Sequence, residues 1–425
     1  MTVASPSRHR TTYRQVLADP RFRLLFLTRC LAIAAGTLRI VALSVLIFAS
    51  TGSVVLSAVA YGIGFLPQMV GAALLGTLAD RVRPRRLIVA GYALEAVTAA
   101  VLGLTRLPAG VSLALVAGVA CTTPVFLGAS NRVVADLLTG DGYVLGRSLY
   151  NMASSGAQLL GFAGGGLAVA ALGSRHALLA AAGCQLLAAL LVRLRLPDLP
   201  VPAGARAQST LRHSLATNRR LLTDTRVRAL LLAQWLPPAF VTGAESLIVS
   251  YAARRGFPAG APGLLLACLP IGMLAGDFVV GRLVYPALRE RLVRPLLVVL
   301  GLPLLAFAAD PPLVFAATLL GISGTGFAYG LGIQRRFLDA LPETSRGQAF
   351  GLLSAGLMTF QGLGPAAFGL LAQLAPTGAA IALAGAATAI TALVHHPPLQ
   401  SRVVPKTRRP SVAAKHWNHN PGREA

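Results

Sequence analysis

The sequence predicts an all-α polytopic membrane protein in which twelve transmembrane helices form two pseudo-symmetric six-helix bundles. Three observations predict this fold class. Apolar residues make up 55% of the 425-residue chain and charged residues only 12%. Uncharged runs of about 20 residues recur, each long enough to cross a hydrocarbon core as a helix that satisfies its own backbone hydrogen bonds. The two halves of the chain also repeat each other.

The apolar runs, separated by turn signals and charges, define the helices in order. We expect them near residues 24–49, 54–79, 87–105, 109–131, 148–172, 176–193, 229–251, 262–284, 293–309, 311–334, 347–373 and 377–394. Pro197, Pro200 and Pro202 open a basic polar stretch that interrupts the pattern. The predicted organisation is a cytoplasmic tail (1–20), an N-terminal bundle (21–195), a cytoplasmic linker (196–228), a C-terminal bundle (229–395) and a flexible cytoplasmic tail (396–425).

The formal net charge of +24 follows the expected topology rather than forming one patch. If the N-terminus is cytoplasmic, the outward loops carry only Arg106, Arg175, Arg254 and Arg255. Almost all other basic residues then lie on the cytoplasmic side, as the positive-inside rule requires. We therefore expect a multi-pass protein of the inner (plasma) membrane with both termini cytoplasmic, in contact with the lipid bilayer and not with nucleic acid.

The sequence carries no motif for catalysis or for a resident metal or cofactor. Cys30, Cys121, Cys184 and Cys268 lie singly on four predicted helices, without metal-ligand spacing. Neither a His-Glu metal box nor a nucleophile elbow is present. A phosphate-binding loop needs a lysine inside its motif, and the only lysines, Lys406 and Lys415, lie in the tail. We therefore expect no enzyme, no metal and no cofactor.

The two halves repeat at an offset of about 203 residues. The fifth and eleventh helices match at four positions: Asn151, Gln158, Gly161 and Gly166 correspond to Ser354, Gln361, Gly364 and Gly369. In the second and eighth helices, Leu66-Pro67 corresponds to Leu269-Pro270. Several matches at one offset are hard to obtain by chance. Parallel repeats of this kind place a binding site between the halves, near the middle of the membrane.

The sharpest local motif is Gly-Thr-Leu-Ala-Asp-Arg-Val-Arg-Pro-Arg-Arg over residues 76–86, in the turn after the second helix. It resembles the G-x-L-x-D-R-x-x-R-R signature of the major facilitator superfamily, and the helix count, linker and repeat extend this resemblance over residues 20–395. The resemblance implies a transporter that alternates between two conformations. It also implies that Gly76, Asp80, Arg81 and Arg85 form a cytoplasmic latch between the halves. An ordinary charged turn is the alternative.

The fifth helix carries Gly-Phe-Ala-Gly-Gly-Gly over residues 161–166, which is similar to the G-P-x-x-G-G element of the family's antiporters. Phe162 stands at the proline position, so the match is partial. Proline appears instead in the eleventh helix, after Gly364. Small residues such as Gly161, Gly165, Gly166 and Gly364 also allow close helix packing in any membrane protein.

Few charged side chains fall inside the predicted helices, and the clear cases are Arg39, Glu95, Glu245 and Asp277. A charge at mid-membrane costs at least ~2.5–3.5 kcal/mol, so each needs a partner, a wet cavity or a function. Arg39 and Glu245 lie at matching depths in repeat-related helices. We therefore predict that they pair across the central cavity, either structurally or to couple a proton to transport. Glu95 is expected to be structural, and Asp277 either lines the cavity or is solvated near the helix end.

Uncharged polar side chains complete the candidate cavity. Asn151, Ser155 and Gln158 share one helical face. Gln361 repeats Gln158 in the other half, Tyr61 and Gln68 share a face of the second helix, and Gln234 with Trp235 begins the seventh. Hydrogen bonding between helices is the alternative role of each.

These features favour a monomeric secondary transporter that exports a small amphipathic or drug-like molecule, coupled to protons or another ion. A cavity of small, apolar and few amide side chains suits apolar ligands better than sugars or polyanions. The direction of transport rests on analogy alone. An importer of a small metabolite is the main alternative, and a membrane scaffold without transport is a further one.

Overall fold

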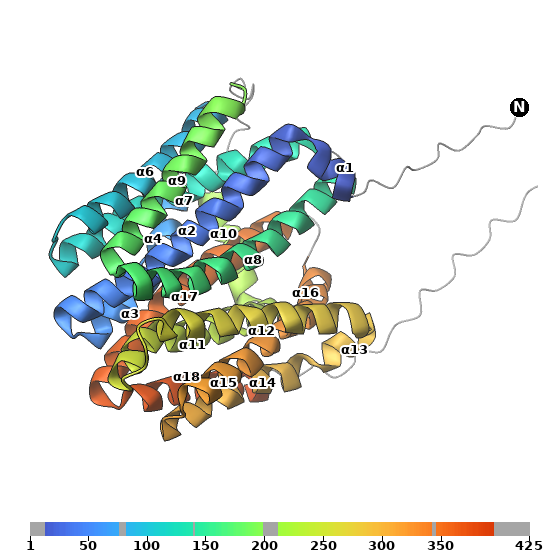
Figure 1. Ribbon diagram of the computed structural model, residues 1–425. Helices are drawn as coiled ribbons and strands as arrows, with labels where there is room; N and C mark the ends of the chain where they lie inside the picture. Colours follow the sequence, from blue (N-terminus) through green and yellow to red (C-terminus); the bar gives the residue numbers. More distant parts are fainter. Residues whose placement is uncertain (1–12, 76–81, 139–140, 199–210, 342–345, 395–425) are drawn as a thin grey trace, which may run out of the picture.

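The computed structural model describes residues 13–75, 82–138, 141–198, 211–341 and 346–394 and is helical almost throughout (Figure 1). The membrane helices of the first half are α2 (Pro20–Thr51), α3 (Val54–Gly62) with α4 (Leu66–Leu75), α6 (Pro84–Leu104), α7 (Ala109–Leu137), α8 (Asp141–Leu172) and α9 (Ser174–Arg195). Those of the second half are α11 (Thr225–Arg254), α12 (Ala261–Leu283), α14 (Val293–Leu305) with η1 (Ala306–Ala309), α15 (Leu313–Thr325) with η2 (Gly326–Ala328) and α16 (Tyr329–Ala340), α17 (Arg346–Leu374) and α18 (Thr377–Val394).

This order confirms the predicted fold class. Within the described ranges, eight helices are long and apolar enough to cross a membrane, and three shorter apolar helices and α11 complete the twelve. Three short helices lie outside the membrane-spanning set: α1 (Tyr13–Ala18), α10 (Leu211–Thr223) and α13 (Pro286–Arg291). The predicted tails, 1–20 and 396–425, fall largely or wholly outside the described residues.

The two ends of the molecule differ in charge. We call the end that holds α1, α10 and α13 the basic end, because Arg85, Arg195 and Arg291 lie there. The opposite end, formed by the connections at 52–53, 105–108, 255–260 and 375–376, is called the distal end. Both halves run across the molecule between these ends, the first in blue to green and the second in yellow to red (Figure 1).

Matching N-caps begin the first helix of each half. The Asp19 carboxylate accepts hydrogen bonds from the backbone N–H groups of Arg21 and Phe22 at the start of α2. The Asp224 carboxylate accepts the same two bonds at the start of α11. An aspartate here satisfies N–H groups that have no partner inside the helix. The internal repeat therefore includes the cap as well as the helix.

The halves meet through α2, α3, α4 and α8 of the first and α11, α12 and α17 of the second. At the distal end the backbones touch: Gly166 of α8 lies against Gly263 of α12, and a Cβ at Gly369 of α17 would meet Ala58 of α3 at 3.0 Å. Toward the basic end the halves diverge in Figure 1. The described conformer is therefore closed at the distal end. We call this glycine-rich contact the distal seam.

Candidate functional site

A break in the second membrane helix creates the site. The α3 helix stops at Gly62 and α4 starts at Leu66, whereas the repeat-related α12 continues through Pro270. The backbone N–H of Gln68 donates to Phe65 O, so the Gly64 carbonyl lacks its normal helical partner. The Gln68 side chain replaces that partner by donating from Nε2 to Gly64 O. Discontinuous helices of this kind form binding sites in transporters.

A cavity of about 150 Å³ lies beside the break, inside the N-terminal half. Four elements line it: α2 with Gly36 and Arg39, the α3–α4 break with Tyr61 and Gln68, α6 with Glu95, and α7. Most of the remaining wall is apolar. A cavity of ~150 Å³ holds a molecule of about the size of benzene, well below the ~300–1,000 Å³ of drug-sized sites. It therefore suits one end group of a solute rather than a whole drug-like molecule.

An ion pair crosses this cavity. Arg39 Nη2 lies 2.9 Å from Glu95 Oε2, and the two side chains are 14% and 17% exposed. The atoms touch without the alignment of a hydrogen bond: Arg39 Nη1 and Glu95 Oε2 have no hydrogen-bond partner among the described residues. The cavity thus presents an unsatisfied donor and an unsatisfied acceptor, which a solute group or water can satisfy.

Tyr61 connects the cavity to the other half. Its side chain is 4% exposed, and its ring stacks on Phe162 of α8 at 6.5 Å between centroids. Its hydroxyl lies close to the carboxylate of Glu245, which lies on α11. Among the described residues Glu245 has no ion-pair partner within salt-bridge distance. Tyr61 therefore belongs both to the cavity wall and to the contact between the halves.

The predicted pairing of Arg39 with Glu245 is wrong in this conformer, because Arg39 pairs with Glu95 and Glu245 lies beside Tyr61. The prediction compared depths along the helices. Residue 95 of a helix ending at 104 and residue 245 of a helix ending at 254 lie equally deep. Depth along the helix therefore cannot decide whether Glu95 or Glu245 is the partner of Arg39. The direction of the side chain around the helix decides, and Arg39 points into its own bundle.

The other predicted polar residues lie outside the wall of this cavity. Trp235 donates from its indole N–H to Leu353 O at 2.9 Å and stacks on Phe360, while Gln234 donates to Leu230 O within its own helix. Gln361 is half-buried on α17, and Gln158 and Asp277 are exposed. The side chain of Asn151 is outside the described set. These residues remain candidates for a wider cavity.

Only part of the predicted latch can be placed, since Gly76, Asp80 and Arg81 lie outside the described residues. Arg85 donates from Nη2 to the Arg193 carbonyl, and Arg83 pairs with Asp198. Both contacts tie the turn before α6 to the end of α9, within the N-terminal half. The latch therefore stays a prediction for a conformer whose basic end is closed.

The predicted packing glycines all lie at close helix approaches. A Cβ at Gly161 would meet the Ala34 carbonyl of α2 at 2.6 Å, and one at Gly165 would meet Leu38 at 3.1 Å. Gly166 faces Gly263 across the halves, and Gly364 faces Ala239 of α11. The glycines of the fifth helix thus serve both the bundle and the distal seam.

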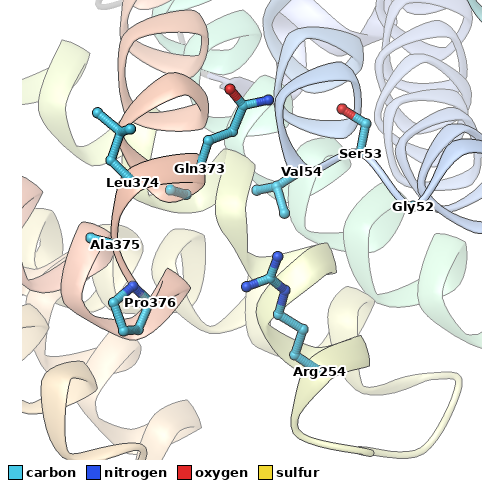
Figure 2. A pocket seen from close by; sticks show the side chains of 9 residues that line it. Gly52, Ser53, Val54, Arg254, Gln373, Leu374, Ala375 and Pro376 are labelled. Carbon is cyan, nitrogen blue, oxygen red and sulfur yellow. The ribbon is translucent and has the colours of Figure 1, made fainter.

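A second cavity, about 590 Å³ and open, lies between the halves at the distal end. Figure 2 shows Arg254 pointing from the end of α11 toward Val54 of α3 and Gln373 of α17. Sequence reasoning placed Arg254 only in an outward loop.

Twelve helices in two repeated bundles, with a polar cavity beside a broken helix, define a secondary transporter fold. Residues 25–335 match the Major Facilitator Superfamily, and the chain belongs to this family. No curated protein sequence matches this chain significantly.

Three solved structures show the same fold. One is the nucleoside transporter NupG, with a TM-score of 0.69 and 14% identity over 88% of this chain and 98% of that one. The xylose transporter XylE from E. coli, in an inward open conformation, gives 0.66 and 14% over 90% and 98%. A bacterial homolog of the human lysosomal transporter Spinster, inward-facing and unoccupied, gives 0.63 and 15% over 88% and 95%.

Proposed function

We propose that the chain exports a small amphipathic organic molecule across the plasma membrane in exchange for protons. The observation that carries the proposal is the cluster of Arg39, Glu95 and Glu245, in which one carboxylate is paired and one is not. A carboxylate whose partner is a neutral hydroxyl can bind and release a proton without breaking an ion pair. Glu245 is therefore the proposed coupling residue.

The orientation follows from charge. With the basic end in the cytoplasm, the positive-inside rule is met and both termini are cytoplasmic. The described conformer, closed at the distal end, is then inward-facing. The likeness to XylE in its inward open conformation supports the same assignment. In this conformer the solute would load from the cytoplasm.

The charge of the cluster limits the solute. Arg39 and Glu95 cancel, so the cluster carries one negative charge when Glu245 is ionised and none when it is protonated. A neutral or singly cationic solute fits this balance, whereas an anion would leave a second uncompensated charge at mid-membrane. The small apolar cavity would hold one end of the solute, and the space between the halves would hold the rest.

The test is proton movement in proteoliposomes, with ethidium as the cationic probe and a pH-sensitive dye inside. We expect ethidium transport to move protons the opposite way, and Glu245→Gln to bind ethidium but move no protons. The matched comparison is Asp339→Asn, which removes an exposed carboxylate from α16 and should leave coupling intact. Full proton movement in Glu245→Gln would remove Glu245 from coupling.

Direction is tested separately, because an importer of a small metabolite has the same fold. NupG is a nucleoside transporter and XylE a xylose transporter, so uridine and xylose serve as probes of that alternative. Counterflow of uridine or xylose, with ethidium neither bound nor moved, would favour import. Ethidium efflux driven by an inward proton gradient would favour export.

A further inference from the structure

Tyr61 of the first half contacts Glu245 of the second half, and Tyr61 also lines the cavity. Tyr61 lies in the last turn of α3, one residue before Gly62, where a Cβ would approach Pro365 Cβ of α17 at 2.8 Å. The end of α3 is therefore pressed against the second half. The Tyr61 hydroxyl reaches Glu245 on α11 from this position.

The same side chain forms a wall of the Arg39–Glu95 cavity. Its ring is held between that cavity and Phe162. A group that enters the cavity therefore meets Tyr61 before it meets anything in the second half. Moving the Tyr61 ring or recruiting its hydroxyl removes its contact with Glu245.

We propose that Tyr61 couples occupancy of this cavity to opening of the distal end. With the cavity empty, the Tyr61–Glu245 contact helps to hold α3 against α11 and keeps the distal end closed. An occupant that displaces the hydroxyl weakens the seam and favours the conformer open at the distal end. Tyr61 is a positioning residue in this scheme, and the inference rests on the alternating conformations of the proposed function.

Distance measurements between spin labels test the proposal without a known solute. One pair joins Thr51 to Gln373 across the distal end, and another joins Arg195 to Arg291 across the basic end; all four residues are exposed. The labels go into a background without Cys30, Cys121, Cys184 and Cys268. A change of conformer lengthens the distal distance and shortens the basic one, whereas unfolding broadens both.

We expect Tyr61→Phe to raise the ratio of distal-open to distal-closed molecules by about threefold to tenfold, the range for a modest polar contact. Glu245→Ala should do the same, and the double variant should add little, because both changes remove one interaction. The control is Tyr92→Phe, whose hydroxyl contacts Thr28 within the first half. Additive shifts, or unchanged distances in both single variants, would overturn the proposal.

Occupancy is imitated by filling the cavity with a side chain. Gly36 lines the cavity, and a methyl group on its Cα would have no neighbouring atom within 4 Å, so Gly36→Leu adds bulk there. Gly118 also has open space but lies outside the cavity wall, and Gly118→Leu is the matched control. We expect Gly36→Leu to open the distal end when Tyr61 is present and to add no further opening in Tyr61→Phe. Equal opening in both backgrounds would show that bulk acts without Tyr61.

These outcomes are distinct from failure of the proposed function. Loss of proton coupling in vesicles concerns Glu245 as a proton carrier. The distances concern the Tyr61–Glu245 contact alone, and they are measured in the absence of any solute or gradient.

Discussion

At the scale of residues, the Arg39–Glu95 pair affects the stability of the first bundle, because each charge offsets the cost of burying the other. Removing one partner leaves the other unpaired in a mostly apolar cavity, which costs about 3 kcal/mol for a buried pair. We expect Arg39→Met and Glu95→Leu each to lower thermal stability in detergent. The double variant should recover most of the loss, because an apolar pair of similar volume can replace a buried ion pair.

The control is Arg335→Met on α16, whose pair with Asp339 is 67% exposed on both sides and worth little. If Arg39→Met were as harmless as Arg335→Met, the pair would be solvated rather than buried. Thermal unfolding of the four variants is the measurement.

The residues of the site were only partly predictable. Composition identifies Arg39, Glu95 and Glu245 as costly charges, and depth along a helix is readable from sequence. Partner choice is not, because it depends on how each helix is rotated about its own axis. Tyr61 was predicted as a cavity residue. Its contact with Glu245 was not predictable, because it depends on the packing of α3 against α11, two helices far apart in sequence.

At the scale of elements, the break between α3 and α4 fixes where the halves touch. Gly62→Ala would place a methyl group against the rigid Pro365 ring and should destabilise the distal-closed conformer by about 1–3 kcal/mol, the usual cost of overpacking. Gly64→Ala, in the same break, meets no atom within 4 Å and is the control. The distal spin-label distance should lengthen in the first variant only. A lengthened distance in both would indicate a change in the break itself.

The paired N-caps give a second prediction at this scale. Asp19→Ala and Asp224→Ala should each cost about 1 kcal/mol, within the usual range of roughly 0.5–2 kcal/mol, because two backbone N–H groups lose their acceptor. Asp339→Ala, an exposed carboxylate, is the control. The two cap variants should lower the unfolding temperature by similar amounts. A loss at only one of them would show that the repeated caps are not equivalent.

Helix boundaries were accessible from sequence because apolar runs and charged turns mark them. The first predicted helix, 24–49, lies within α2, and the last, 377–394, coincides with α18. The break after Gly62 was missed, since Leu66-Pro67 has a repeat counterpart at Leu269-Pro270 that leaves α12 continuous. At the break, Gly62 packs against Pro365 of the other half, and no local sequence pattern reports such a contact.

At the scale of the whole molecule, two contacts act on one equilibrium with opposite sign. The Tyr61–Glu245 contact favours the distal-closed conformer. The predicted latch containing Asp80 favours the conformer that is open at the distal end. We expect Asp80→Asn to shift the distances further toward distal closure by several-fold, since its interaction with a helix N-terminus is worth about 0.3–1 kcal/mol, and up to ~2 kcal/mol when partly buried. Asp198→Asn, which affects a pair within the first half, is the control. A shift toward distal opening would contradict the latch.

The distal seam also has a thermal consequence. Where Gly166 meets Gly263, backbone touches backbone, because neither residue carries a side chain. Separating such surfaces exposes little apolar area to water, and apolar area is what gives a conformational change a large heat capacity. The Gly166–Gly263 contact should then add little to the temperature dependence of the enthalpy of opening. It should therefore add little curvature to a plot of the logarithm of the conformer ratio against inverse temperature.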